Sequence, residues 1–185
     1  MRYFTSDHHF FHNKVIQFEN RPFNNLEEMH DNFINYWNKT ITPKDIVYYL
    51  GDFSFGKIAQ TRGIINCLNG RVIFIKGNHD HESDGMYLDA GFSSIAEQMI
   101  ISLAKDIKVK LCHYPYVSAD ADSPPRYADR RPSKEDYWLL HGHSHSKFGI
   151  RPEVKSISVC WDYWKRFLNE NEIVSIIRKS NAVLN

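Results

Sequence analysis

The chain has 185 residues, of which 42% are hydrophobic and 24% are charged, as is ordinary for a globular protein with one main core. We therefore expect a single domain over residues 1–185. The formal net charge of +1 excludes a strongly basic surface that captures long nucleic acids, so affinity for an anionic substrate must come from a local site.

Neither a membrane segment nor a secretory leader is expected. No run approaches the ~20 apolar residues that a membrane-spanning helix needs, and residues 1–10 lack the basic start and apolar stretch of a signal peptide. Three widely spaced cysteines, Cys67, Cys112 and Cys160, argue against a disulfide framework. We therefore expect a cytoplasmic protein whose cysteines are reduced and lie in the core.

The first half of the chain alternates predicted strands and helices. Apolar runs that end in polar or glycine-rich residues predict strands at residues 2–6, 45–50 and 71–76. Apolar residues at helical spacing predict a helix over residues 26–41, and Asn25 with Glu28 resembles a capping box at its start. A second helix is predicted over residues 58–68 and ends at Asn69-Gly70. This alternation is typical of α/β architecture.

The second half is richer in predicted strands, at residues 107–112, 136–140, 155–160 and 173–178. We therefore expect mixed sheets. Residues 118–136, with paired prolines and three arginines, predict a long loop. A loop of this length is either functional or disordered, and the sequence leaves both interpretations open.

Potential metal ligands directly follow five of the predicted strands. They are Asp7, His8 and His9 after the first, Asp52 after the second, Asn78, His79 and Asp80 after the third, His113 after the fourth, and His143 and His145 after the fifth. In open α/β sheets, ligands bind at the carboxyl ends of strands. We therefore expect these side chains to converge on one site.

The spacing and the residue types indicate a metal centre. Asp7 and His9 are two residues apart, as are His143 and His145, and residues two apart in extended backbone point the same way. Glycines at positions 51, 77 and 142 permit sharp turns and close approach of the backbone. Carboxylate, amide oxygen and imidazole together suit Mn²⁺, Fe²⁺ or Zn²⁺, whereas a structural zinc site would favour cysteines. Even seven of these ten residues would be too many ligands for one ion, so we expect two ions.

These residues together resemble a known family. Asp7-x-His9, Gly51-Asp52, Gly77-Asn78-His79-Asp80, His113 and Gly142-His143-x-His145 resemble, in order, the full motif series of the calcineurin-like metallophosphoesterases. The motifs span residues 7 to 145, and five motifs in the family's order are a specific signal. The segments SDHHFFHNKVIQFENRPF and YYLGDFSFG also resemble a compact branch found in bacteria and phages. The resemblance implies an α/β fold, a four-layer αββα sandwich of two mixed β-sheets flanked by helices.

The resemblance also implies a role for each motif residue. One divalent ion would be held by Asp7, His9 and His145, a second by Asn78, His113 and His143, and Asp52 would bridge both. His79 would be the catalytic residue, which faces the substrate without binding metal and donates to a phosphate oxygen or to the leaving group. We expect both ions to be Mn²⁺, with Fe²⁺, Zn²⁺ and Ni²⁺ as alternatives.

The expected function is a dinuclear metal-dependent phosphoesterase that attacks phosphate esters with a metal-activated hydroxide. Two divalent ions, offset by two aspartates and one hydroxide, leave about one positive charge, which matches the single negative charge of a phosphodiester. We therefore expect phosphodiesters as substrates, small molecules or nucleotides. The alternatives are a phosphomonoesterase and a non-catalytic metal-binding interaction protein. The last is disfavoured because every ligand and His79 are present. Neither a membrane nor a stably bound nucleic acid is expected as a partner.

Residues outside the core motifs have weaker assignments. His12, Arg21 and Arg126 are candidates for substrate contact, although Arg126 is most simply a solvated side chain of the predicted loop. Asp80 is expected to stabilise its turn or to orient His79. The sequence gives no indication of an oligomeric state.

Overall fold

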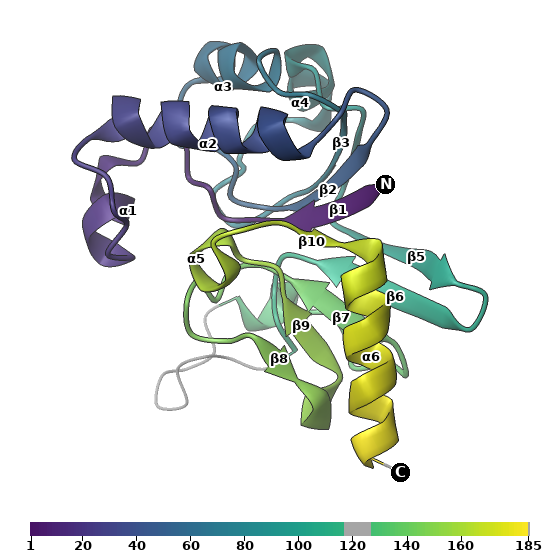
Figure 1. Ribbon diagram of the computed structural model, residues 1–185. Coiled ribbons are helices and arrows are strands. Elements are labelled where there is room, and N and C mark those ends of the chain that lie inside the picture. The colour runs from purple at the N-terminus through teal and green to yellow at the C-terminus, as the bar shows by residue number, and fades with distance from the viewer. Residues whose placement is uncertain (117–126, 185) are drawn as a thin grey trace.

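The computed structural model describes residues 1–116 and 127–184, which form two five-stranded β-sheets (Figure 1). In the first sheet the strand order is β10-β1-β2-β3-β4. Its parallel strands are β1 (Arg2–Thr5), β2 (Ile46–Leu50), β3 (Arg71–Ile75) and β4 (Ser94–Ala96), and β10 (Leu168–Asn169) pairs antiparallel with β1.

The second sheet has the strand order β5-β6-β7-β9-β8. Its three central strands, β6 (Ile107–Cys112), β7 (Trp138–His141) and β9 (Ser156–Ser158), are parallel. The edge strands β5 (Gln98–Ala104) and β8 (Ile150–Arg151) run antiparallel to their neighbours. Both sheets are therefore mixed, as expected.

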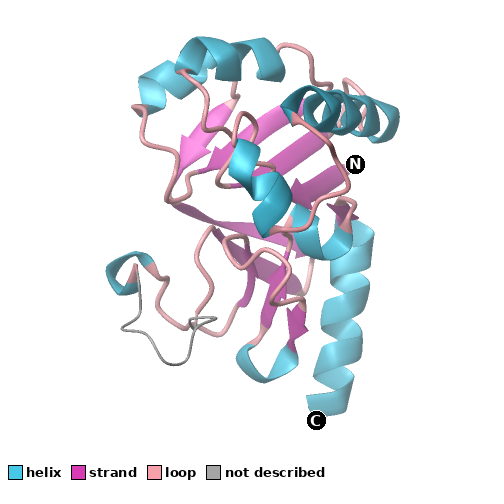
Figure 2. Ribbon diagram, turned by 90° about the vertical axis from the view of Figure 1, so that its left-hand side faces the viewer, coloured by secondary structure: helices cyan, strands magenta, loops and turns pink. Residues whose placement is uncertain are grey.

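Helices flank the sheets. Three helices cover the outer face of the first sheet: α2 (Leu26–Thr40), α3 (Ile58–Ile65) and α4 (Asp84–Ala90). In Figure 2 these helices lie at the top, above the strands of that sheet. Helix α6 (Glu170–Leu184) contacts β1 and β10 of the first sheet and β5 of the second. The shorter helices are α1 (Asn13–Phe18), α5 (Trp161–Trp164) and two 3₁₀ turns, η1 (Ala128–Arg130) and η2 (Pro152–Val154). The predicted class, two mixed sheets flanked by helices, is confirmed.

Strand β2 shows how the core is divided. Alternate side chains of a strand point to opposite faces of the sheet. Val47 and Tyr49 pack among residues of α2 and α3, whereas Tyr48 and Leu50 pack between the two sheets. Because both faces are covered, the strand is the continuous apolar run IVYYL. The packing on both faces therefore holds the end of β2 in place, and the loop that carries Asp52 starts from this fixed end.

Helix α2 begins as predicted. The side chain of its N-cap residue, Asn25, accepts a hydrogen bond from the backbone N–H of Glu28 at 2.9 Å. The Glu28 carboxylate bonds back to Asn24 at 2.8 Å instead of Asn25. Helix α3 ends at Ile65, before the predicted end at residue 68, and the chain continues in turns toward Gly70.

The predicted strand at residues 173–178 is wrong, because these residues lie inside helix α6. The side chain of Asn169 accepts from the backbone N–H of Glu172 at 3.1 Å, and the Glu172 carboxylate accepts from the backbone N–H of Asn169 at 3.0 Å. This reciprocal capping box starts the helix. Ile173 and Ile177, one helical turn apart, pack into the core between the sheets. Capping and packing thus override the β-propensity of the branched side chains.

Cys112 and Cys160 are buried as expected, but Cys67 is exposed, because it lies in the turn that follows α3. Across residues 1–116 and 127–184, no helix combines the length and the apolar character that crossing a membrane requires.

Candidate metal centre

The predicted metal ligands lie together, at the carboxyl ends of parallel strands from both sheets. The first sheet contributes Asp7 and His9 beyond β1, Asp52 beyond β2 and Asn78 beyond β3, and the second contributes His113 beyond β6 and His143 and His145 beyond β7. Backbone hydrogen bonds join the loop after β1 to the loop after β2. The N–H of Asp7 donates to the carbonyl oxygen of Gly51 at 3.0 Å, and the N–H of His9 donates to that of Asp52 at 3.2 Å. The parallel topology therefore brings distant motifs to one place.

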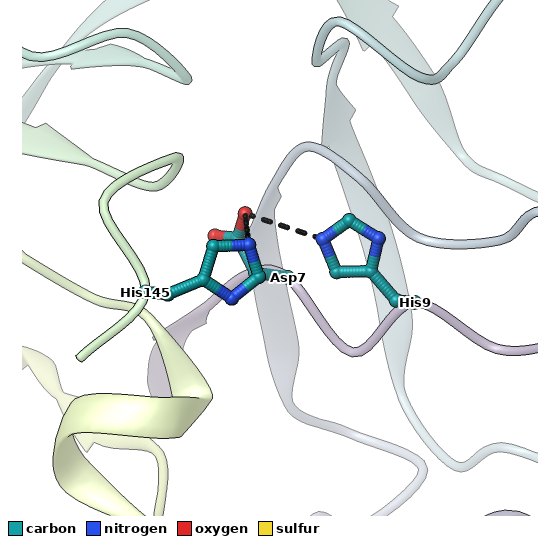
Figure 3. Close-up of side chains that lie close together, drawn as sticks. All are labelled: Asp7, His9 and His145. Carbon is teal, nitrogen blue, oxygen red and sulfur yellow. Dashed lines mark ion pairs between the residues drawn. The ribbon is translucent and has the colours of Figure 1, made fainter. Parts of the chain in front are cut away.

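One group of candidate ligands consists of Asp7, His9 and His145 (Figure 3), of which one ligand atom each lies within 4.8 Å of the others. The Nε2 atoms of His9 and His145 lie 3.8 Å and 3.9 Å from Oδ1 of Asp7, and both imidazoles turn toward the carboxylate. Metal bonds to imidazole nitrogen and carboxylate oxygen are about 2.0–2.2 Å long. These separations therefore suit ligands that share one ion.

A second group surrounds Asp52 and Asn78. Oδ2 of Asp52 lies 3.6 Å from Nε2 of His113 and 3.7 Å from Nε2 of His9. Oδ1 of Asn78 lies 3.1 Å from Nε2 of His113 and 2.8 Å from Nδ1 of His143. Asp52 thus lies between a ligand of the first group and a ligand of the second, which is the position that a bridging carboxylate needs.

The donor set fits divalent ions. Both ring nitrogens of His9 are buried, and neither has a hydrogen-bond partner in the part of the chain that the structure describes. A buried polar atom of this kind requires a partner, and a metal ion supplies one. Oxygen and imidazole donors suit Mn²⁺, Fe²⁺, Zn²⁺ or Ni²⁺. The thiol of Cys160 donates to Oδ2 of Asp7 at 3.1 Å and so supports a ligand.

Five candidate ligands have a left-handed backbone. The φ angles are 61° at Asp7, 53° at His9, 57° at Asp52, 69° at His143 and 46° at His145. A non-glycine residue in this region costs about 1–3 kcal/mol, although Asp and His tolerate it better than most. The residue pairs therefore face the site through sharp turns, and the expectation that they lie on extended backbone is wrong.

Two glycines are required by close approach. A Cβ atom at Gly77 would lie 2.2 Å from Oδ1 of Asp52, and one at Gly142 would lie 2.7 Å from Oδ2 of Asp7. Neither glycine has a positive φ. Their role is therefore to leave space for the two carboxylates.

Hydrogen bonds behind the ligands orient two imidazoles. Nδ1 of His113 lies 2.8 Å from the carbonyl oxygen of Leu50, and Nδ1 of His145 lies 2.8 Å from Oδ2 of Asp162. Because Nδ1 donates in each case, the Nε2 lone pair points toward the centre. The sequence analysis did not single out Asp162, because it belongs to none of the motifs, although its place two residues after the strand predicted at residues 155–160 was an available signal.

Arg21 does not have the substrate-facing position expected of it. Its guanidinium is buried and donates to both carboxylate oxygens of Asp162 at 2.8 Å. It also donates to the backbone oxygens of Asp7 at 2.7 Å and His8 at 2.6 Å. Arg21 therefore braces the ligand loop from behind.

Asp80 stabilises its turn, which is one of the two roles expected of it. Its carboxylate accepts backbone hydrogen bonds from Asp52 at 2.6 Å, Gly77 at 2.8 Å and Phe53 at 3.2 Å. Asp80 thereby joins the loops that follow β2 and β3. Burial raises its pKa to about 6, even though these three hydrogen bonds favour the ionised form.

The carboxylates of Asp7 and Asp52 differ in their electrostatics. Burial, together with the charges of Asp80 and Asp7, raises the pKa of Asp52 well above its ordinary value. Burial acts in the same direction on Asp7, but its interactions with His9, His113 and His145 outweigh burial and hold its pKa well below the ordinary value. Divalent cations would stabilise both carboxylates in the ionised form.

His79 lies beside these groups and is half-exposed. Its backbone N–H donates to Oδ1 of Asp52 at 3.0 Å, and its ring centroid is 5.8 Å from that of His9. Burial, with a further contribution from neighbouring imidazoles, lowers its pKa to about 4. The ring is therefore neutral at pH 7 and has one N–H to donate.

The remaining candidates differ in position. The ring of His12 lies 5.7 Å from that of His9 and stacks on Phe55 at 4.1 Å, so His12 borders the site. Arg126 lies outside the described residues. Phe55 was not predicted as a site residue. Its position three residues after the candidate ligand Asp52 could have indicated that it lies near the site.

Comparison with known proteins identifies relatives of similar length. A family model for the calcineurin-like phosphoesterase superfamily domain matches residues 5–161. The uncharacterised protein MJ1445 of Methanocaldococcus jannaschii is 34% identical, over 98% of this chain and 93% of its own. The gene 66 protein of Mycobacterium phage D29 is 32% identical, over 95% and 94%. The crystal structure of a protein of unknown function, AQ665 from Aquifex aeolicus, superposes with a TM-score of 0.74 and 28% identity, covering 96% of this chain and 99% of the other.

Proposed function

The chain belongs to the calcineurin-like phosphoesterase superfamily, and on that basis we propose that it hydrolyses phosphodiesters with the help of two divalent metal ions. Family membership and the clusters of candidate ligands support a metal-dependent phosphoesterase. The observation that carries the proposal is the placement of the Asp52 carboxylate between His9 and His113, at 3.7 Å and 3.6 Å.

The ligand groups divide the work of metal binding. Asp7, His9 and His145 would hold one ion, Asn78, His113 and His143 would hold the other, and Asp52 would contact both. When bound, such ions polarise the phosphate and activate a water molecule for in-line attack. Candidate metals are Mn²⁺ first, then Fe²⁺, Zn²⁺ and Ni²⁺.

His79 would act on the substrate directly. Its backbone is anchored to Asp52 at 3.0 Å, whereas its half-exposed ring lies outside the two ligand groups. A neutral imidazole can donate a hydrogen bond to a phosphate oxygen or to the leaving oxygen, where negative charge grows as the ester bond breaks.

The preference for diesters follows from charge. Two divalent ions, two carboxylates and one deprotonated water sum to about one positive charge, which suits the single negative charge of a diester. A monoester is nearly a dianion at neutral pH and would need further cationic groups. Arg21 does not offer that help, because its guanidinium is buried and paired with Asp162. Arg130 is exposed, 3.3 Å from the hydroxyl of Tyr114, and is the observation that keeps the monoesterase alternative open.

The test compares kcat/KM for bis-p-nitrophenyl phosphate and p-nitrophenyl phosphate on one Mn²⁺-loaded preparation at neutral pH. We expect the diester to be preferred and Asp52→Asn to abolish both activities, which excludes a contaminating phosphatase. A preference for the monoester that disappears in Arg130→Ala would establish the monoesterase alternative. Metal-loaded protein without activity on either ester would support the non-catalytic alternative.

A further inference from the structure

An exposed aromatic ring lies beside His79. Phe55 is 40% exposed, and its ring centroid is 4.5 Å from that of His79 and 5.2 Å from that of His9. The ring also stacks on His12 at 4.1 Å with an interplanar angle of 13°. A single exposed Phe is common on protein surfaces, but this one contacts the proposed catalytic residue and a candidate ligand.

The backbone holds Phe55 firmly in this position. Its N–H donates to the carbonyl oxygen of Phe10 at 2.8 Å, and the preceding residue, Ser54, forms a β-bridge with Phe10. The N–H of Gly56 donates to Oγ of Ser54 at 3.0 Å, and Thr61 donates to the same oxygen at 2.9 Å. The loop thus presents the ring in a defined position, which lowers the ordering cost of binding.

A cavity of about 270 Å³ adjoins this ring. Phe55 and Tyr87 contribute aromatic walls, His79 connects the cavity to the candidate metal centre, and Glu82 adds a hydrogen-bond acceptor. The volume is slightly below the ~300–1,000 Å³ of pockets for drug-sized ligands. The cavity therefore suits a single flat ring system.

We propose that this cavity binds a planar aromatic group of the substrate, such as a nucleobase, packed against Phe55, while the phosphate lies at the candidate metal centre. The inference rests on the proposed function and deepens it, because it specifies phosphate esters of nucleosides or similar aromatic groups as the substrate class. Aromatic side chains gain affinity for bases by stacking, and each base typically contributes about tenfold or more. Glu82 would accept a hydrogen bond from a ring or exocyclic N–H.

The test measures binding, so it does not depend on turnover. Mn²⁺-loaded protein is titrated calorimetrically with the methylphosphinate analogues of adenosine 5′-monophosphate and ribose 5-phosphate, which carry a single negative charge, as a phosphodiester does. In both, a methylene group replaces the ester oxygen, so neither is hydrolysed. We expect the adenosine analogue to bind about tenfold more tightly. Phe55→Ala should lower this affinity ratio toward one, whereas Phe55→Trp should keep it.

Ile100→Ala is the matched control, since it removes an apolar side chain, 46% exposed, from β5 of the other sheet. It should retain the wild-type ratio. Equal affinities in the wild-type protein, or an unchanged ratio in Phe55→Ala with full metal content, would overturn the proposed cavity ligand while leaving the proposed function intact. If neither analogue binds the metal-loaded protein, the proposed phosphate site fails, and this inference fails with it.

Discussion

Nδ1 of His145 lies 2.8 Å from Oδ2 of Asp162, and Arg21 holds the same oxygen from the other side at 2.8 Å. Burial alone would raise the pKa of Asp162, but the hydrogen bonds from His145 and Arg21 outweigh it and keep the pKa well below its ordinary value. The carboxylate is therefore ionised and retains the proton on Nδ1 of His145. Nε2 is then free as a ligand.

Asp162→Asn should weaken metal binding at the group formed by Asp7, His9 and His145. Loss of such a carboxylate partner typically costs 10–100-fold in metal affinity, so we expect a decrease of about that size. Titration of metal-free protein with Mn²⁺ measures it. Asp136→Asn is the control, because Asp136 forms an ion pair with Lys155 but its side chain is 97% exposed. Equal affinities in Asp162→Asn and wild type would contradict the role of Asp162.

Two metal ions should bind per chain, and Asp52→Asn should weaken both. The reason is that one carboxylate, 3.7 Å from His9 and 3.6 Å from His113, supplies negative charge to both groups. Elemental analysis after Mn²⁺ loading gives the stoichiometry. A limit of one ion at saturation would rule out the dinuclear centre.

His79→Ala and His113→Ala should separate catalysis from metal binding. A positioned hydrogen-bond donor or acid typically contributes ~10²–10⁴-fold in rate, so His79→Ala should slow turnover by about that factor with two ions retained. His113→Ala should lose metal together with activity, because His113 lies within 4.8 Å of ligand atoms of both Asp7 and Asp52. Turnover and metal content are measured on the same samples. Loss of metal in His79→Ala would show that the two roles are wrongly assigned.

Gly77→Ala should disrupt the centre, because its Cβ would lie 2.2 Å from Oδ1 of Asp52 and 2.7 Å from the backbone nitrogen of Asp52. We expect reduced metal content and activity. Gly63→Ala is the matched control, because this glycine lies inside α3 and a Cβ there would meet nothing within 4 Å. It should keep activity and raise the free energy of unfolding by about 0.5–1 kcal/mol, since alanine favours helices. Elemental analysis and activity assays check Gly77→Ala, and an activity assay with a denaturant titration checks Gly63→Ala.

His30 should make stability depend on pH. Its Nε2 accepts the backbone N–H of Phe11 at 2.9 Å, which only the neutral ring can do. Burial lowers the pKa of His30 below 6.5, although Asp31 opposes the shift. The stabilising contribution is therefore complete above about pH 6.5 and is lost as the pH falls through the folded-state pKa.

His30→Gln supplies an acceptor that does not titrate, so the difference in free energy of unfolding between wild type and variant should decrease from pH 7.5 to pH 5. The decrease should stay below about 1 kcal/mol, because the ring is half-buried and solvent screens it. Urea titrations of the metal-free proteins at the two pH values measure it. A difference that is independent of pH would exclude this contribution of His30.

The candidate ligands could be located from the sequence because each motif begins directly after an apolar strand, as Asp7 and His113 do. Parallel pairing then brings the strand ends together, so that residues 106 positions apart in the sequence lie within 4.8 Å. Metal binding by these residues remains a prediction. The left-handed turns at His9 and His145 could not be anticipated, because φ at a histidine is set by the surrounding loops.

Other features depend on contacts that no local pattern records. Arg21 and Asp162 pair across 141 positions of sequence. Arg21 lies in the segment that resembles the compact branch, but nothing in that segment indicates its partner, and Asp162 belongs to no motif. Residues 173–178 show the opposite difficulty, since their branched side chains favour a strand locally. The helix is explained by the capping pair Asn169 and Glu172 and by the burial of Ile173 and Ile177. These contacts become visible only once the chain is folded.

The distribution of the ligands over the two sheets has a consequence for unfolding. The first group takes Asp7 and His9 from the first sheet and His145 from the second, and the second group takes Asn78 from the first sheet and His113 and His143 from the second. Each ion would therefore cross-link the two sheets at one end, in the way that a disulfide bond cross-links two segments of a chain. The sheets then cannot separate at that end without breaking coordination bonds, so metal content would determine how cooperatively the two halves of the sandwich unfold.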